Sequence, residues 1–129
     1  MTHNISVRVY YEDTDLAGIV YYANYLKFIE RARTEWVRDL GVDQGALKAE
    51  TGTVFAVRRV EADYLIAAKF DDVLTVRTEL VKLGGASLIV QQDVLRGDEI
   101  LFTAKVTIVA IGSEGKAVRL PPVIRDPLL

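Results

Sequence analysis

Two carboxylates, Asp13 and Asp15, stand close together in the stretch YYEDTDLAGIVYY, directly before an amphipathic segment. A positioned carboxylate can attack a carbonyl carbon or deprotonate a water molecule. If the following segment is a helix, the free N–H groups of its first turn can hold the oxyanion that such an attack creates. The aliphatic and aromatic residues 19–22 would exclude water and strengthen both effects. The stretch therefore suits acyl transfer to water without cysteine, histidine or metal.

Three other interpretations of this stretch stay open on the residues alone. The letters D-T-D-L-A-G match the start of a calcium loop, but Ala17 stands at the fifth position of that loop and Asn24, not Glu, at its twelfth. A D-x-D turn is also typical of aspartate-nucleophile phosphatases, which need a buried apolar strand before the turn and a parallel α/β core. Finally, Asp, Thr and Gly are ordinary turn formers, and acidic residues before a helix favour its positive end.

The composition excludes several other classes of site and partner. The 129 residues include no cysteine, and the one histidine, His3, lies near the N-terminus, which disfavours a Ser-His-Asp triad or a zinc site. The net charge of −2 argues against binding to nucleic acid or to a membrane surface. There is no apolar signal-peptide core and no run long enough to span a membrane. We expect a single cytoplasmic domain over residues 1–129.

Hydrophobic periodicity predicts the elements on either side of the turn. Residues 5–11 alternate, which indicates a half-buried strand. Its buried side is expected to carry Ile5, Val7, Val9 and Tyr11. From about Ala23 apolar residues recur every three or four positions, which predicts a long helix with Asn24 as N-cap and Gly41 as its stop.

The rest of the chain indicates a sheet. A short helix is predicted over residues 43–50, and residues 119–129 form a proline-bearing tail. Four strands are expected over residues 53–66, 71–84, 86–97 and 99–112. Because these four follow one another, they are expected to be hairpin-linked, giving an α+β fold with about five antiparallel strands packed on one long helix. Such a sheet leaves edges uncovered, so we expect at least a dimer.

The segment RVYYEDTDLAGIVYYANYLKFIERARTEWVRDLGV closely resembles the start of acyl-CoA thioesterases of the hotdog fold, and FAVRRVEADYLIAAKFDDVLTVRTEL extends the match. It is most similar to the Tol-Pal-associated branch and also similar to 4-hydroxybenzoyl-CoA thioesterase. The resemblance implies a curved antiparallel sheet around the long helix, in homodimers and often homotetramers. It also implies hydrolysis of an acyl-CoA or aroyl-CoA, with no cofactor beyond the CoA of the substrate and no metal.

The resemblance assigns roles within the turn. Asp15 falls on the catalytic carboxylate, which acts as nucleophile or as general base. The backbone N–H of Tyr22 falls on the oxyanion donor, although Tol-Pal-associated members often carry His there. Gly18 is expected to serve the backbone geometry near the thioester, because a Cβ would crowd the chain or the ligand, whereas Asp13 shapes the turn.

Other candidate residues keep two interpretations. Val20 and Tyr21 are expected beside the thioester, and Tyr25 is either pocket wall or core. Arg58 and Arg59 are adjacent, so on a strand they should point to opposite faces, and one of them either binds a CoA phosphate or is a surface charge.

Two alternatives to an acyl-CoA hydrolase remain. The first is a non-catalytic protein that binds acyl-CoA or an acyl carrier protein on the same fold. The second is a hydratase, which would call for a catalytic histidine that only His3 could supply. A carrier-protein thioester is a further possible substrate.

Overall fold

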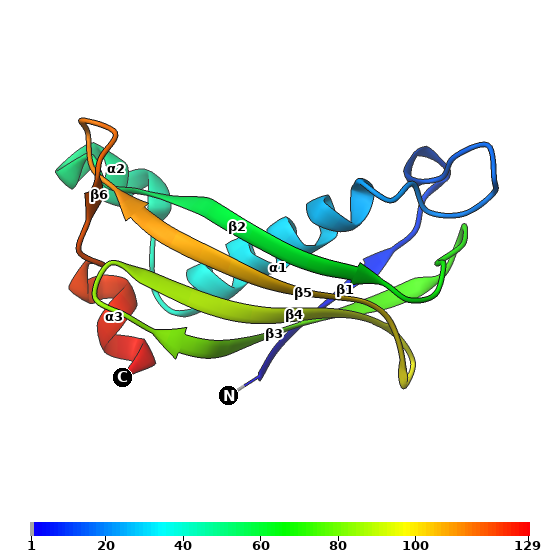
Figure 1. Ribbon diagram of the computed structural model, residues 1–129. Helices are drawn as coiled ribbons and strands as arrows, with labels where there is room; N and C mark the ends of the chain where they lie inside the picture. Colours follow the sequence, from blue (N-terminus) through cyan, green and yellow to red (C-terminus); the bar gives the residue numbers. More distant parts are fainter. Residues whose placement is uncertain (1) are drawn as a thin grey trace.

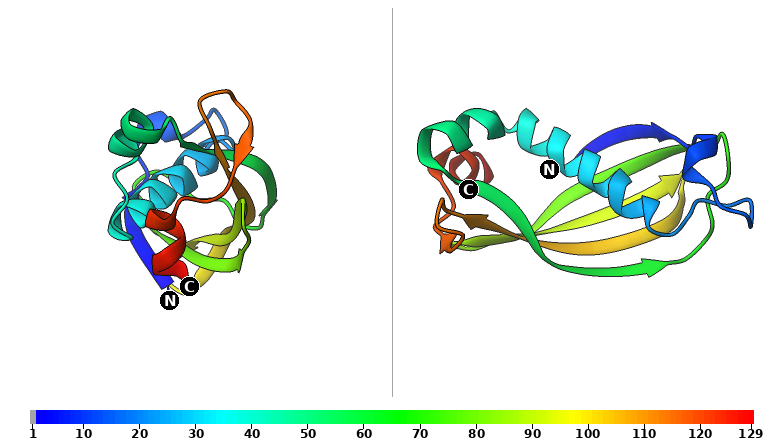
Figure 2. Two further views of the ribbon diagram at one scale, coloured as in Figure 1. Left: turned by 90° about the vertical axis from the view of Figure 1, so that its left-hand side faces the viewer. Right: turned by 90° about the horizontal axis from the view of Figure 1, so that it is seen from above.

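The structure, a computed structural model, describes residues 2–129. Its elements in chain order are β1 (Thr2–Arg8), a 3-10 turn η1 (Tyr11–Asp13), α1 (Asn24–Asp39), α2 (Gln44–Thr51), β2 (Val54–Tyr64), β3 (Val73–Leu83), β4 (Ser87–Arg96), β5 (Glu99–Ile111), β6 (Ala117–Val118) and α3 (Pro122–Leu128). The strands form one curved antiparallel sheet, and α1 lies within its curve (Figures 1 and 2). The predicted α+β arrangement around one long helix is confirmed.

The strand order is β1-β3-β4-β5-β2, with β6 adding to β5. The prediction that four consecutive strands are linked by hairpins is therefore wrong for β2. Only β3, β4 and β5 follow one another as neighbours, whereas β2 pairs with β5, for example Val60 opposite Val106. Residues 65–72 carry the chain from β2 past β5 and β4 to β3. Alternation identifies a strand but says nothing about its neighbour, which is why the pattern missed this crossing.

The core lies between α1 and the inner face of the sheet. The helix contributes Phe28, Ile29 and Ala32, which are fully or almost fully buried. Gln92 of β4 is also fully buried; its Nε2 donates to the carbonyl of Ile29 and its Oε1 accepts from Arg33. This amide fixes α1 to the sheet at mid-helix, because each buried polar group needs its partner.

Two expected details at the helix start are corrected. Asn24 is the first residue of α1 and Ala23 is the N-cap; the side-chain amide of Asn24 donates to the carbonyl of Asp13. Tyr11 is largely exposed, because β1 ends at Arg8 and the alternation does not continue into η1. At the other end Gly41, with φ +94°, follows the last turn of α1 and ends it, as predicted.

The proline-bearing tail contains a helix, α3, that the sequence pattern did not predict. Pro122 opens it, a position where the missing N–H costs nothing. Ile124 of α3 is buried. The helix α3 lies at the same end of the sheet as α2, away from the loop that precedes α1 (Figure 1). The C-terminal segment thus closes the end of the core where α1 finishes.

The edge strand β2 is poorly covered. The helix α1 packs on β1, β3 and β4, so the inward-facing Val57 and Val60 of β2 remain 44% and 39% exposed. No helix within residues 2–129 is long and apolar enough to cross a membrane.

Candidate active site

The turn that carries Asp15 is a tight hairpin that projects from one end of the sheet (Figure 1). Thr14 and Val20 pair across it, the Asp15 N–H donates to the carbonyl of Ile19 at 3.0 Å, and the Gly18 N–H donates to the carbonyl of Asp15 at 2.9 Å. The Asp15 carboxylate is exposed, and its Oδ1 accepts the N–H of Ala17 at 2.9 Å. The backbone therefore holds this carboxylate at the tip of the turn, open to solvent.

Gly18 is required in this turn by its backbone angle. Its φ of +80° lies in the left-handed region, where a side chain is strained. A Cβ added there would meet no atom within 4 Å. The expectation that a Cβ would crowd the chain is therefore wrong, because the turn is exposed and the requirement comes from φ.

Asp13 joins the turn to the start of α1. Its carboxylate accepts the N–H of Tyr10 at 2.8 Å, which closes η1. Its carbonyl accepts the N–H of Tyr21 and the side-chain amide of Asn24, both at 2.9 Å. Both ends of Asp13 are thus engaged in shaping the backbone, as expected for the structural member of the two carboxylates.

The start of α1 offers a free backbone donor. Tyr21 and Asn24 donate their N–H groups to other residues, whereas the N–H of Tyr22 has no acceptor within residues 2–129. This N–H lies just before the first turn of a helix of 16 residues, where the helix carries partial positive charge. An oxyanion placed there would gain a hydrogen bond and a favourable field.

The loop before β3 is hydrogen-bonded both to the turn and to α1. The N–H of Val20 donates to the carbonyl of Ala68 at 2.9 Å, and the N–H of Ala68 donates to the hydroxyl oxygen of Tyr25 at 3.0 Å. Val20 and Tyr25 are almost fully buried, and burial raises the pKa of the Tyr25 hydroxyl. Tyr25 therefore lies in the core, where it positions the loop that holds the turn.

Tyr64, which the sequence did not suggest, joins the tyrosines at the helix start. Its hydroxyl donates to the carbonyl of Tyr22 at 3.1 Å, and the two ring centroids lie 5.9 Å apart. The rings of Tyr21 and Tyr22 meet edge to face at 5.0 Å. Burial raises the pKa of Tyr64, and the neighbouring hydroxyls of Tyr22 and Tyr25 raise it further, so its hydroxyl stays protonated and able to donate. The sequence pattern could not reveal Tyr64, because its contact with Tyr22 depends on β2 ending beside α1.

Arg58 and Arg59 lie on β2, outside this cluster. The register of β2 against β5 shifts between Val57 and Arg59, so a β-bulge interrupts the alternation there. Both Val57 and Val60 pair with buried residues of β5, and the two arginines lie between them. The expectation of opposite faces assumes regular pleating, which this bulge interrupts. Both side chains are exposed, and Arg59 contacts Glu61 at 3.4 Å.

Together these features give an exposed carboxylate on a rigid turn, a free N–H at a helix start and a wall of tyrosines. The turn and the helix are joined through the carbonyl of Asp13. The described residues 2–129 bring together no group of three His, Asp or Glu side chains able to hold a metal ion. The chemistry that this arrangement suits is attack on a carbonyl and stabilisation of the resulting oxyanion.

Comparison with known proteins gives the family. The sequence profile described as Thioesterase superfamily matches residues 17–103. An acyl-CoA thioesterase of Haemophilus influenzae, YbgC, is 45% identical over 105 residues, which cover 81% of this chain and 77% of the relative. The chain therefore belongs to the thioesterase superfamily.

Solved structures agree with this assignment. A probable thioesterase from Bartonella henselae superimposes with a TM-score of 0.90 at 40% identity, covering 94% of this chain and all of that one. A mutant 4-hydroxybenzoyl-CoA thioesterase in complex with 4-hydroxybenzoyl-CoA gives a TM-score of 0.90 at 22% identity over 98% of this chain and 97% of that one. At that identity the second likeness shows the fold alone.

Proposed function

We propose that this chain hydrolyses acyl-CoA thioesters to a free acid and CoA, with the Asp15 carboxylate as the catalytic group. The observation that carries the proposal is the hydrogen-bonded link, through the Asp13 carbonyl, between the exposed Asp15 turn and the start of α1. Just before that helix the Tyr22 N–H has no acceptor within residues 2–129. The 45% identity to an acyl-CoA thioesterase supports the same substrate class.

The proposed chemistry follows two routes to the same products. As a nucleophile, the Asp15 carboxylate adds to the thioester carbonyl, and water later cleaves the anhydride. As a general base, it takes a proton from the water that attacks the same carbon. In both routes the Tyr22 N–H holds the oxyanion, which then collapses and expels the CoA thiolate. An oxyanion donor contributes about 10²–10³ in rate and a positioned base about 10²–10⁴.

The surrounding residues have supporting roles in this proposal. Gly18 and Val20 fix the conformation of the turn, while the rings of Tyr21 and Tyr22 shield the thioester from water. Arg58 or Arg59 binds a CoA phosphate, which two exposed guanidinium groups on one strand suit. No metal or cofactor takes part, and an acyl carrier protein is an alternative donor of the thioester.

We also propose a homodimer formed through β2. This strand is an outer edge of the sheet, so one side of its backbone has no neighbouring strand within residues 2–129. Unpaired edges of this kind are normally covered, and a second copy would pair its own β2 there. Two dimers would then form the homotetramer that the family resemblance implies. We further propose that the protein acts in the cytoplasm and belongs to the Tol-Pal-associated branch of the family.

The test is turnover of a thioester panel by the purified protein, with short aliphatic, long aliphatic and aroyl-CoA at matched concentration. Release of CoA thiol measures hydrolysis, and equilibrium binding is measured on the same panel. We expect multiple turnovers on at least one class. Binding of CoA esters without turnover of any of them would replace the proposal by the non-catalytic acyl-binding alternative.

A further inference from the structure

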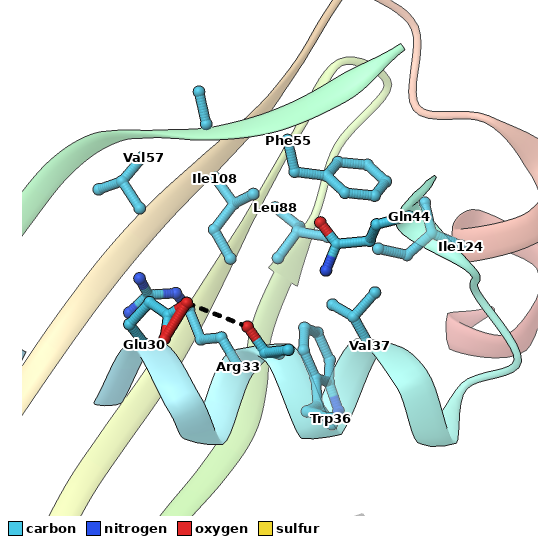
Figure 3. Close-up of a pocket in the computed structure, with 12 residues that line it drawn as sticks. Glu30, Arg33, Trp36, Val37, Gln44, Phe55, Val57, Leu88, Ile108 and Ile124 are labelled. Atoms are coloured by element: carbon cyan, nitrogen blue, oxygen red, sulfur yellow. Dashed lines mark hydrogen bonds between the residues drawn. The ribbon is translucent and has the colours of Figure 1, made fainter. Parts of the chain in front are cut away.

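A cavity that is partly open to solvent lies at the end of α1 that is remote from the Asp15 turn. Its volume is about 140 Å³. Figure 3 shows Leu88 and Ile108 reaching into it from the sheet and Val37 facing them from α1. Phe55 of β2 and Ile124 of α3 close the far side. We call this space the end cavity.

The end cavity is suited to an apolar guest. Its walls are mainly aliphatic and aromatic, and Trp36 forms part of them. For scale, an engineered cavity of about 150 Å³ with wholly apolar walls binds benzene, so a space of this size can hold several carbon atoms. Four polar residues also line it, and three of them are hydrogen-bonded: Thr34 donates to Glu30 at 3.2 Å, and Arg33 donates to the buried Gln92 at 3.0 Å, while Gln44 is the fourth.

An open groove between α1 and β2 leads to the end cavity. It is lined by Leu26, Lys27, Ile29, Glu30, Arg31, Arg33, Val57 and Val60. Glu30, Arg33 and Val57 line both spaces, so the groove and the end cavity adjoin. Leu26, Val57 and Val60 are 41%, 44% and 39% exposed, which leaves an apolar strip that nothing in the described chain covers.

The groove begins about one helical turn after the proposed oxyanion donor. Leu26 lies four residues after Tyr22, which is about one helical turn. At about 1.5 Å per residue, Glu30 lies roughly 12 Å and Val37 roughly 22 Å along the axis from Tyr22. An extended chain advances about 1.2 Å per bond, taken from about 3.5 Å for the three bonds of one residue. About 10 bonds therefore reach the mouth of the end cavity, and about 18 cross it.

We propose that the groove and the end cavity bind the hydrocarbon tail of a long-chain aliphatic acyl-CoA, of about 12–18 carbons by the bond spacing above. This inference rests on the proposed function for the position of the thioester. The apolar strip binds the middle of the tail, and the end cavity takes its last carbons. Val57, which lines both spaces, controls passage between them.

A binding measurement tests this without turnover, because Trp36 is the single tryptophan and lines the end cavity. The probe is a non-hydrolysable hexadecyl thioether of CoA that carries bromine, a fluorescence quencher, on its last carbon. We expect strong quenching of the Trp36 emission by this probe and none by a butyl thioether brominated in the same way. Binding of the long probe without quenching would overturn the inference.

Kinetics provide the second arm. Val57→Phe fills the passage, whereas the control Val54→Phe adds the same bulk to the same edge strand at a residue that lines neither space. Each lost methylene contact is worth a factor of about four, so losing two lowers kcat/KM for hexadecanoyl-CoA about fifteenfold. The measured quantity is the ratio of kcat/KM for hexadecanoyl-CoA to kcat/KM for butanoyl-CoA, which should fall in Val57→Phe and stay at the wild-type value in Val54→Phe. Equal losses on both substrates, or no loss on either, would contradict the proposal.

The two arms separate the two proposals. Quenching of Trp36 in a protein that hydrolyses no thioester would remove the proposed function and leave the tail site standing. Turnover without quenching by the long probe, and with no effect of Val57→Phe on chain-length preference, would remove the tail site and leave the proposed function standing.

Discussion

Removing the Tyr64 hydroxyl should slow catalysis without weakening substrate binding. That hydroxyl donates to the carbonyl of Tyr22 at 3.1 Å and so joins the end of β2 to the residues just before α1. Tyr64→Phe keeps the ring packing against Tyr22 and Phe102, at 5.9 and 5.0 Å between centroids, so only the hydrogen bond is lost. The perturbation is thus confined to the peptide that begins the helix.

The magnitude follows from that bond. A hydrogen bond of this kind contributes about 1 kcal/mol net, so the free energy of unfolding should fall by about that amount. If the bond also holds the Tyr22 N–H in line with the oxyanion, the same energy corresponds to roughly a fivefold fall in kcat. KM should change little, because the tail and the CoA contacts remain. The assay is steady-state kinetics on the best substrate, beside chemical unfolding of the same preparation.

Tyr22→Phe is the matched control. It removes a neighbouring hydroxyl that makes no hydrogen bond within residues 2–129, and we expect wild-type kcat. The reasoning would be refuted if Tyr64→Phe lost its 1 kcal/mol of stability while kcat stayed unchanged. A fall beyond tenfold in Tyr22→Phe would instead assign the chemistry to that hydroxyl.

Three further changes have defined outcomes. Gly18→Ala forces a side chain into φ +80°, so kcat/KM should fall and stability drop by about 1–2 kcal/mol, with partial recovery in Gly18→Asn; equal activity of both variants with wild type would refute this. Gln92→Leu removes buried hydrogen bonds and should lower the free energy of unfolding, measured in urea, by about 3 kcal/mol. A loss below about 1 kcal/mol would show that other contacts fix α1 to the sheet. Burial raises the pKa of Asp93, but hydrogen bonds from Thr103, Arg77 and Gln91 outweigh it and hold that pKa below its usual value. The stability that Asp93 contributes is therefore present above the unfolded pKa of about 4 and is lost as the pH falls toward the lower folded value, and Asp93→Asn should flatten the stability curve below about pH 5.

Local pattern was enough to predict the long helix and the strands. The apolar period of three to four residues and Gly41 determine the body and the end of α1, because both depend on residues within one element. The strand predictions agree with β2, β3, β4 and β5 to within a few residues. The order of the strands in the sheet could not be predicted, because the alternation in β2 is the same whether its neighbour is β3 or β5.

The site divides in the same way. The turn that carries Asp15 and Gly18 was accessible because a turn before a helix is visible in the sequence, whereas the choice of Asp15 over Asp13 came from the family resemblance. Tyr64 was not, because it reaches Tyr22 only through the placement of β2 at the sheet edge beside α1. The bulge at Arg58 also escaped, because one extra residue in a strand leaves the hydrophobic pattern almost unchanged.

The central claim is that the Asp15 carboxylate, and not Asp13, carries the chemistry. The most direct measurement is single-turnover hydrolysis by Asp15→Asn beside Asp13→Asn, each shown to be folded. Asp15→Asn keeps the acceptor for the Ala17 N–H, so only the reactive charge is lost, and the rate should fall by about 10²–10⁴. Asp13→Asn should keep most of the rate and most of the stability, because its amide oxygen can still accept the Tyr10 N–H and its backbone carbonyl is unchanged. A folded Asp15→Asn that keeps most of the wild-type rate would contradict the account.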